Sequence, residues 1–135
     1  MQKGLIVHAL ISNNNGEVLI LRRSKLNDVL MGYWDIPGGT LEDGEDPAAG
    51  AIRETQEETG FTIRRPRFIT FVNDIVPESG IHWITLYFRA EYTSGEPRTA
   101  EGEIGDWSWY AWDSLPRPLF TPTRNFVRSG YNPST

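Results

Sequence analysis

The chain contains no cysteine among its 135 residues, which excludes disulfide bonds, thiol catalysis and cysteine-ligated zinc. It also lacks any apolar run near the roughly 18 residues that a membrane-spanning helix requires. Basic residues are the minority, since 13 Lys and Arg stand against 18 Asp and Glu, for a formal net charge of -5. This balance argues against a large nucleic-acid surface, because clustered Lys and Arg hold phosphate backbones. A small anionic substrate is compatible with it, because a bound divalent metal inverts the local charge.

Size and composition indicate one ordinary globular domain. Hydrophobic residues make up 39% of the chain and charged residues 23%, which is typical of an ordered protein. A length of 135 residues fits a single domain spanning residues 1–135. The first residues, Met1–Gly4, lead directly into an alternating apolar stretch that is typical of a strand and not of a signal peptide. We therefore expect a single domain that works in the cytoplasm.

Strand-like runs dominate the chain. The first two are separated by Asn15-Gly16, a strong hairpin signal because both residue types tolerate positive φ. A polar connection over residues 93–105 predicts a loop, and Pro37-Gly38-Gly39 predicts a turn. Strands covered by one or two helices indicate an α+β fold. The predicted strands are Gly4–Ile11, Val18–Arg23, Tyr33–Ile36, Arg67–Asn73, His82–Tyr92 and Asp106–Trp112.

Two helices are predicted from their end signals. Asp46 is suited to the N-cap and Pro47 to the first helical position, while Gly60 is a good stop, so a helix is expected over Pro47–Thr59. A shorter helix is expected to begin at Thr121-Pro122 and to end near Arg128.

Three glutamates share one face of the first predicted helix. Glu54, Glu57 and Glu58 follow spacings of three and four, with Arg53 at their edge. Like charges at these spacings destabilise a helix by a few tenths of a kcal/mol per pair, and a hard cation such as Mg²⁺ would offset that cost. Taken alone, such glutamates are more often a solvated acidic face. The opposite face is expected to pack on the sheet and carries Ala48, Ile52, Thr55 and Thr59.

The residues around this helix favour the metal interpretation, because they resemble the Nudix box. Gly39 and Glu45 precede the run Arg53-Glu54-Thr55-Gln56-Glu57-Glu58-Thr59-Gly60-Phe61 at the spacing of that motif. The departure is Thr55, where the family usually carries an aliphatic residue. Similarity to MutT-like members extends over most of the chain, through Leu21-Arg22-Arg23, Trp34–Gly39, His82–Leu86, Gly95-Glu96-Pro97, Glu101-Gly102 and Asp106-Trp107.

The resemblance implies the Nudix fold, a mixed β-sheet sandwiched between helices in an α/β/α arrangement. It also implies hydrolysis of a nucleoside diphosphate linkage by water, with Mg²⁺ as cofactor and Mn²⁺ as a substitute. By position, Glu54 and Glu58 would be the principal metal ligands, with Glu57 a further ligand and the carbonyl of Gly38 a backbone ligand. Arg53 would orient the box carboxylates, with Glu45 as its expected partner. The expected catalytic set is therefore Arg53, Glu57, Glu58 and Glu101.

The sequence leaves the roles of several residues open. Glu57 and Glu101 are both candidates for the general base. Arg22 and Arg23 are adjacent in a strand and must point to opposite faces, so at most one contacts substrate phosphate, and Arg23 is the candidate. The two histidines, His8 and His82, lack partners at metal-ligand spacing and are expected to be packed or surface residues. Base stacking is open among the aromatic residues Trp107, Trp109, Tyr110, Trp112, Phe71, Trp83 and Phe120, for which packing is the commoner role.

Three functions follow from the resemblance. The leading one is a MutT-type nucleoside triphosphate pyrophosphohydrolase that releases a nucleoside monophosphate and pyrophosphate, with oxidised nucleotides such as 8-oxo-dGTP as candidate substrates. The second is a pyrophosphatase for ADP-ribose, a dinucleotide polyphosphate or a nucleotide sugar. The third is a non-catalytic Nudix module that senses a nucleotide, against which the intact Glu54, Glu57 and Glu58 argue. A small nucleotide is the expected partner of a monomer or homodimer, with no nucleic-acid polymer and no membrane.

Overall fold

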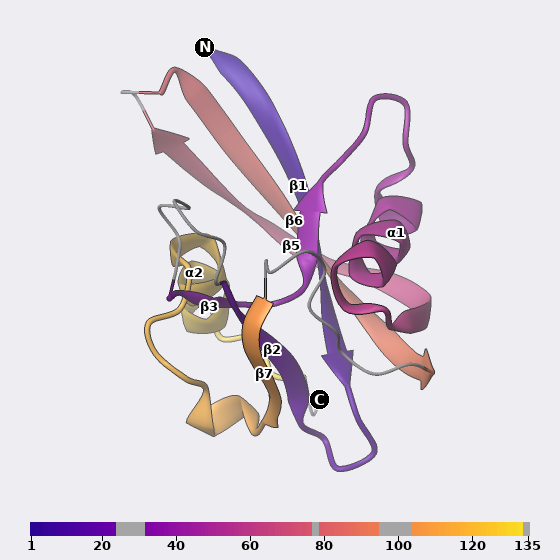
Figure 1. Cartoon of the computed structure of the whole chain (residues 1–135). Coiled ribbons are helices and arrows are strands. Elements are labelled where there is room, and N and C mark those ends of the chain that lie inside the picture. The colour runs from indigo at the N-terminus through magenta and orange to yellow at the C-terminus, as the bar shows by residue number, and fades with distance from the viewer. Residues whose placement is uncertain (24–31, 77–78, 95–103, 134–135) are drawn as a thin grey trace.

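A strongly twisted β-sheet occupies the centre of the molecule (Figure 1). The computed structural model describes residues 1–23, 32–76, 79–94 and 104–133. Its strands are β1 (Gln2–Ser12), β2 (Val18–Arg23), β3 (Trp34–Asp35), β4 (Gly38–Thr40), β5 (Thr62–Val76), β6 (Ile81–Ser94) and β7 (Ile104–Tyr110). The helices are α1 (Pro47–Thr59) and α2 (Thr121–Arg128), and a short 3₁₀ turn, η1, covers Trp112–Ser114.

The sheet is mixed, with strand order β3-β2-β1-β6-β5. The central pair, β1 and β6, runs parallel from Gln2 opposite Ile81 to Ser12 opposite Glu91. The other pairings between the named strands are antiparallel, including β4 on β1 and β7 on β2. The predicted α+β class is confirmed.

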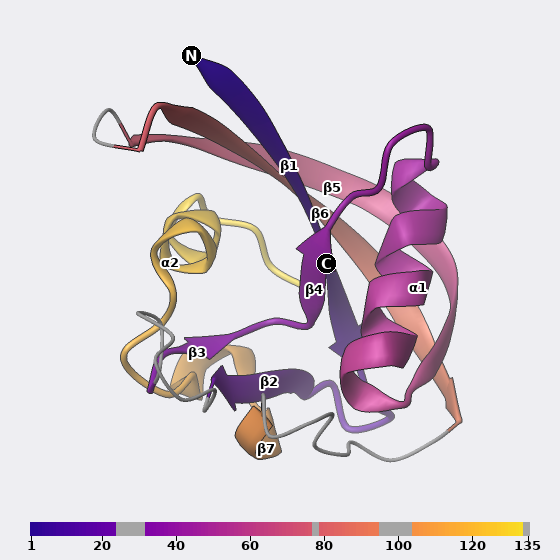
Figure 2. The same ribbon diagram turned by 45° about the horizontal axis from the view of Figure 1, so that its top comes forward.

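The two helices cover opposite faces of the sheet (Figure 2). Successive side chains of β1 alternate between two cores, as the pleat of a strand requires. Val7 and Ala9 pack with Ala51 of α1, whereas Leu10 packs with Tyr87 and with Phe126 of α2. The expected sandwich of a sheet between helices is therefore present.

The boundaries of α1 are those predicted from its end signals. The side chain of Asp46 accepts a hydrogen bond from the backbone N–H of Ala49 at 3.1 Å. Gly60 closes the helix with φ 81°, and its N–H donates to the carbonyl of Gln56. Thr55, the departure from the family pattern, is fully buried, and its hydroxyl donates to the carbonyl of Ala51 at 2.8 Å. A threonine is tolerated under the helix because this bond satisfies its polar group.

Several predicted strand and turn boundaries need correction. The predicted turn at Pro37–Gly39 is wrong in part, because Gly38–Thr40 forms β4 against β1. The long strand β5 begins before Arg67 because a bulge, with Arg65 at φ 55°, carries the pairing through Pro66. The predicted strand at 33–36 shortens to β3, and Trp112 lies in η1 instead of β7. In the first hairpin only the glycine adopts positive φ, at 75°.

Candidate active site

The first feature of the site is a corner where β4 meets α1. The N–H of Gly38 donates to Glu58 Oε1 at 3.1 Å. A Cβ on Gly39 would lie 2.2 Å from Glu54 Oε2, and a Cβ on Gly38 would lie 1.9 Å from the ring of His8. These contacts explain the two glycines, because any side chain there would displace the carboxylates or the neighbouring strand. Glu54 and Glu58 therefore meet the backbone of one short strand.

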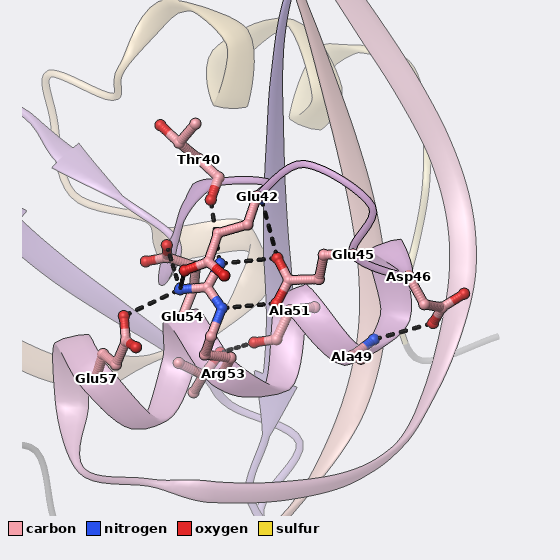
Figure 3. A network of polar contacts seen from close by, with 10 residues as sticks. Thr40, Glu42, Glu45, Asp46, Ala49, Ala51, Arg53, Glu54 and Glu57 are labelled. Atoms are coloured by element: carbon pink, nitrogen blue, oxygen red, sulfur yellow. Dashed lines mark hydrogen bonds and ion pairs between the residues drawn. The ribbon is translucent and has the colours of Figure 1, made fainter.

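Arg53 organises the acidic groups around this corner (Figure 3). Its guanidinium donates to both oxygens of Glu45, through Nε at 2.6 Å and Nη2 at 2.9 Å. Its Nη1 lies 2.9 Å from Glu54 Oε1 and 3.0 Å from Glu57 Oε2, and Nη2 donates to the carbonyl of Thr40 at 3.2 Å. The hydrogen bonds from Arg53 lower the pKa of Glu45 to about 2. The expected pairing of Arg53 with Glu45 is thus present, and it ties the loop before α1 to the helix.

The three box glutamates occupy different environments. Burial raises the pKa of Glu58 to about 8, against the opposing effect of the hydrogen bond from Gly38, and the nearby carboxylate of Asp35 raises it further. Burial also raises the pKa of Glu54. The side chain of Glu57 is 60% exposed and points to Arg53. The helix face thus divides into a half-buried pair, Glu54 and Glu58, and an outer residue, Glu57.

The half-buried pair is suited to a hard divalent cation. Carboxylate and carbonyl oxygens are the ligands that Mg²⁺ prefers, and it typically takes one or two carboxylates and completes its shell with waters and phosphates. Glu54, Glu58 and the carbonyl of Gly38 fit that donor set. Within the ranges that the structure describes, no group of three or more His, Cys, Asp or Glu side chains is placed so that it could hold a metal ion. Glu101, the other expected catalytic residue, lies outside the described residues.

Arg22 and Arg23 lie at the end of β2, where the pairing with β7 is irregular. Arg22 pairs with Asp106 at 2.5 Å and lies over the ring of Trp34, at 5.7 Å from its centroid. Both arginines line a small space of about 20 Å³ that also includes Asp35 and Glu58. The expected alternation of these two side chains therefore stays a prediction, and Arg23 lies beside the corner.

A larger cavity of about 740 Å³ adjoins the corner on the α2 side of the sheet. Arg23, Asp35 and Gly38 line both the small space and this cavity. The wall from the sheet carries Ile6, His8, Trp83, Thr85 and Asp74, and the opposite wall is the segment Phe120–Pro122. The backbone of Trp34 holds that segment in place, since its N–H donates to the carbonyl of Pro118 and its carbonyl accepts from the N–H of Phe120. The cavity is therefore bounded by two parts of the chain that are far apart in sequence.

A buried polar network beneath the cavity was not anticipated from the sequence. Asp35 is 6% exposed and accepts hydrogen bonds from the hydroxyl of Thr123 and from the N–H of Ile36. The hydroxyls of Tyr87 and Thr123 lie 2.9 Å apart, and His8 Nε2 is 3.6 Å from Asp35 Oδ2. The network links α2 to β3, the strand that leads into Gly38. An acidic residue inside a hydrophobic strand was the one available signal.

Most of the histidine and aromatic candidates lie outside the large cavity. His8 is packed beneath the cavity, and burial lowers its pKa. His82 Nε2 lies 3.0 Å from Asn73 Oδ1, outside the cavity wall. Trp109 stacks on Phe61 in the core, and Trp112 packs on α2. Of the stacking candidates, only Trp83 and Phe120 are among the residues lining the large cavity.

Comparison with known proteins decides the family. A family model described as NUDIX domain matches residues 2–129. The chain belongs to the Nudix family. Among its Nudix relatives is the 8-oxo-dGTP diphosphatase of Escherichia coli, which is 35% identical over 108 residues that cover 79% of this chain and 81% of that protein. The NAD-capped RNA hydrolase NudC of Pseudomonas aeruginosa is 34% identical over 100 residues, or 74% of this chain, but the match spans only 34% of that longer protein.

Solved structures agree with this assignment. The MutT Nudix hydrolase from Burkholderia pseudomallei superposes with a TM-score of 0.85 at 29% identity, covering 97% of this chain and all of that one. The chain is a MutT-like Nudix hydrolase, and thus an enzyme that cleaves phosphoanhydride bonds. None of the helices in the described ranges is long and apolar enough to cross a membrane.

Proposed function

We propose that this Nudix hydrolase cleaves nucleoside triphosphates to a nucleoside monophosphate and pyrophosphate in a Mg²⁺-dependent reaction. Oxidised nucleotides such as 8-oxo-dGTP are the proposed substrates of first choice. The observation that carries the proposal is the corner itself, where Glu58 meets Gly38 and Glu54 meets Gly39 beside a nucleotide-sized cavity. Support for the substrate class comes from the Escherichia coli relative, which matches over most of its own length.

In this proposal Glu54, Glu58 and the carbonyl of Gly38 hold the metal, and Glu57 is a further ligand or a contact through water. A bound divalent ion supplies charge neutralisation at the phosphates and a more acidic water. Arg53 is a positioning residue, because its contacts are with Glu45, Glu54 and Glu57. Its guanidinium holds the carboxylates at fixed spacing, so that little reorganisation is needed when the substrate arrives.

The chemical step replaces one P–O bond by another. The oxygen of a water molecule bonds to phosphorus, the phosphoanhydride bond breaks, and the water proton passes to a nearby carboxylate. Glu57 and Glu101 are the two proposed acceptors of that proton. Arg23 is proposed to hold a phosphate of the substrate, since a guanidinium matches two phosphate oxygens. Its place between the small space and the large cavity suits that role.

We further propose that the protein acts in the cytoplasm on free nucleotides, as a monomer or homodimer. Neither a nucleic-acid polymer nor a membrane is a proposed partner, which is in keeping with the net charge of -5. The alternative substrates, namely ADP-ribose, dinucleotide polyphosphates and nucleotide sugars, would use the same carboxylates. The carboxylates at the corner therefore do not discriminate between these substrates, and an experiment must do so.

The test is a product analysis on the purified protein. It is incubated with normal and 8-oxo nucleoside triphosphates, ADP-ribose, diadenosine polyphosphates and NADH, each with Mg²⁺ and with EDTA. Glu58→Ala removes a proposed ligand, and Glu91→Ala removes an exposed carboxylate on β6 as a matched control. We expect a monophosphate and pyrophosphate from a triphosphate, lost with EDTA and in Glu58→Ala but kept in Glu91→Ala.

Other outcomes discriminate between the alternatives. Turnover of ADP-ribose or another linked diphosphate alone would keep the metal chemistry and discard the triphosphate proposal. Nucleotide binding without turnover of any compound would contradict the proposed reaction and favour the sensing module. Full activity of Glu58→Ala would contradict the proposal that the corner is the catalytic centre.

A further inference from the structure

Three buried side-chain atoms in the described part of the chain lack a hydrogen-bond partner, namely His8 Nδ1, Thr85 Oγ1 and Asp74 Oδ2. All three residues line the same large cavity. Buried polar atoms without partners are rare in native proteins because leaving them unpaired is unfavourable. Their convergence on one cavity makes its sheet wall a candidate surface for binding a ligand.

The three side chains belong to one face of three adjacent strands. Ile6 of β1 is opposite Thr85 of β6, so His8, two residues on, shares the side of Ile6. Asp74 of β5 is opposite Trp83 of β6, which lies two residues before Thr85 on the same side. This is the α2 face, and the polar atoms form a row across β1, β6 and β5.

The row is rich in hydrogen-bond acceptors. The ring of His8 has its Nε2 3.6 Å from the carboxylate of Asp35. The tautomer with its proton on Nε2 leaves Nδ1 as an acceptor. An ionised Asp74 can only accept, while the hydroxyl of Thr85 can do either. A ligand that pairs with this row must therefore offer hydrogen-bond donors, and the N–H groups of a base are suited to that.

The rest of the wall is suited to a flat ring. Trp83 and Phe120 present aromatic surface, and Ile6 and Pro122 add apolar area. Aromatic side chains stack on any nucleobase, so they bind the base without choosing it. Discrimination between bases must therefore come from the row of hydrogen-bond acceptors.

We propose that this cavity selects a guanine-type base and that Asp74 is its specificity-determining residue. The N1–H and N2–H₂ groups of guanine lie side by side and match the two oxygens of a carboxylate. Adenine, cytosine and uracil each place an acceptor beside their N–H donor on that edge, which a carboxylate repels. An 8-oxo base keeps the guanine edge. The inference rests on the proposed function, in that the phosphates of the same nucleotide occupy the corner.

Calorimetric titration tests the inference without turnover. The probes are the non-hydrolysable α,β-methylene analogues of GTP, ITP, ATP, CTP and UTP, titrated with Mg²⁺ and again with EDTA. We expect the GTP analogue to bind most tightly, and the ITP analogue, which lacks the N2 amino group, to bind more weakly. Asp74→Asn should weaken binding of the GTP analogue about 10- to 100-fold, because a hydrogen bond to a charged acceptor is lost. The same variant should bind the ATP analogue as well as the native protein or better, because an amide pairs with adenine.

Glu91→Gln, which neutralises an exposed carboxylate on β6, is the matched control and should leave all five affinities unchanged. Equal affinity of the native protein for all five analogues would overturn the inference, as would a uniform loss in Asp74→Asn or no binding at all. The two proposals fail separately. A guanine preference that depends on Asp74, without turnover of any triphosphate, would support this inference and sink the proposed reaction. Turnover of triphosphates without any base preference would support the proposed reaction and contradict this inference.

Discussion

The corner beside α1 and the large cavity beside α2 differ in whether the polar side chains that line them have partners within the protein. At the corner, Arg53 contacts Glu45, Glu54 and Glu57, and Glu58 accepts from the backbone of Gly38. In the cavity, the polar atoms His8 Nδ1, Thr85 Oγ1 and Asp74 Oδ2 have no partner within the described part of the molecule.

The difference is what the two proposals require, with the reaction at the corner and recognition of the base in the cavity. Carboxylates that must keep a fixed geometry are held by protein groups before the substrate binds, which reduces reorganisation during the reaction. Acceptors that must choose between bases are left open, because a group already paired within the protein cannot discriminate between ligands. The unpaired atoms lower the stability of the free protein, whereas the Arg53 network adds to it. The following variants test whether this contrast holds.

Arg53→Lys should give the largest effect, at the corner. A lysine ammonium is a point charge and cannot keep two bonds to Glu45 while bridging Glu54 and Glu57. We expect kcat to fall by about 10- to 100-fold, with a smaller change in KM, because the residue positions proposed ligands and does not hold the nucleotide. Raising the Mg²⁺ concentration should restore part of the rate. Steady-state kinetics over a Mg²⁺ series measure both effects.

The matched control is Arg64→Lys on β5, an exposed arginine whose side chain is 60% accessible. It should leave kcat and the Mg²⁺ dependence unchanged. An Arg53→Lys enzyme with native kcat at all Mg²⁺ concentrations would show that the network is not needed to position the carboxylates.

Thr85→Val, in the large cavity beside α2, should raise the stability of the free protein by a moderate amount. Removing a buried hydroxyl that has no partner relieves a cost of about 1 kcal/mol or more, so the free protein should melt about 3–5 °C higher. Nucleotide binding should weaken at the same time. Thermal unfolding with and without the GTP analogue checks both expectations.

Thr55→Val is the control, because Thr55 is equally buried but its hydroxyl is bonded to the carbonyl of Ala51. Its Tm should stay the same or fall. If both variants raise Tm equally, the gain comes from valine itself, and the contrast between satisfied and open polar groups is not its cause.

The smallest effect concerns acid stability. Arg53 holds the pKa of Glu45 near 2 in the folded protein, below its ordinary value of 4.5. A depressed folded-state pKa adds stability above the unfolded-state pKa, and this stability is lost as pH falls from about 4.5 toward 2. Glu45→Gln should therefore flatten the dependence of Tm on pH in this window. Melting curves between pH 6 and pH 2 measure the slope, and a variant with the native slope would contradict the linkage. Glu91→Gln serves again as the exposed-carboxylate control.

Local rules account for most of what could be predicted. Asp46, Pro47 and Gly60 are end signals that act within one turn of the helix, and α1 begins and ends where they predict. Long-range pairing accounts for the failures. The strand at Gly38–Thr40 exists because it pairs with Ile6–His8, which no local propensity encodes. The extension of β5 past the bulge at Arg65 likewise depends on its partner β6.

Contiguous residues specify the helix Pro47–Thr59, its charge set and the family, because helical spacing and motif spacing are local properties. The tertiary structure brings Glu58 to Gly38 and Glu54 to Gly39, since that depends on β4 lying against α1. It also decided that the open acceptors of His8, Thr85 and Asp74 form one row. Those residues are far apart along the chain, and only the pairing of β1, β6 and β5 brings them to one face.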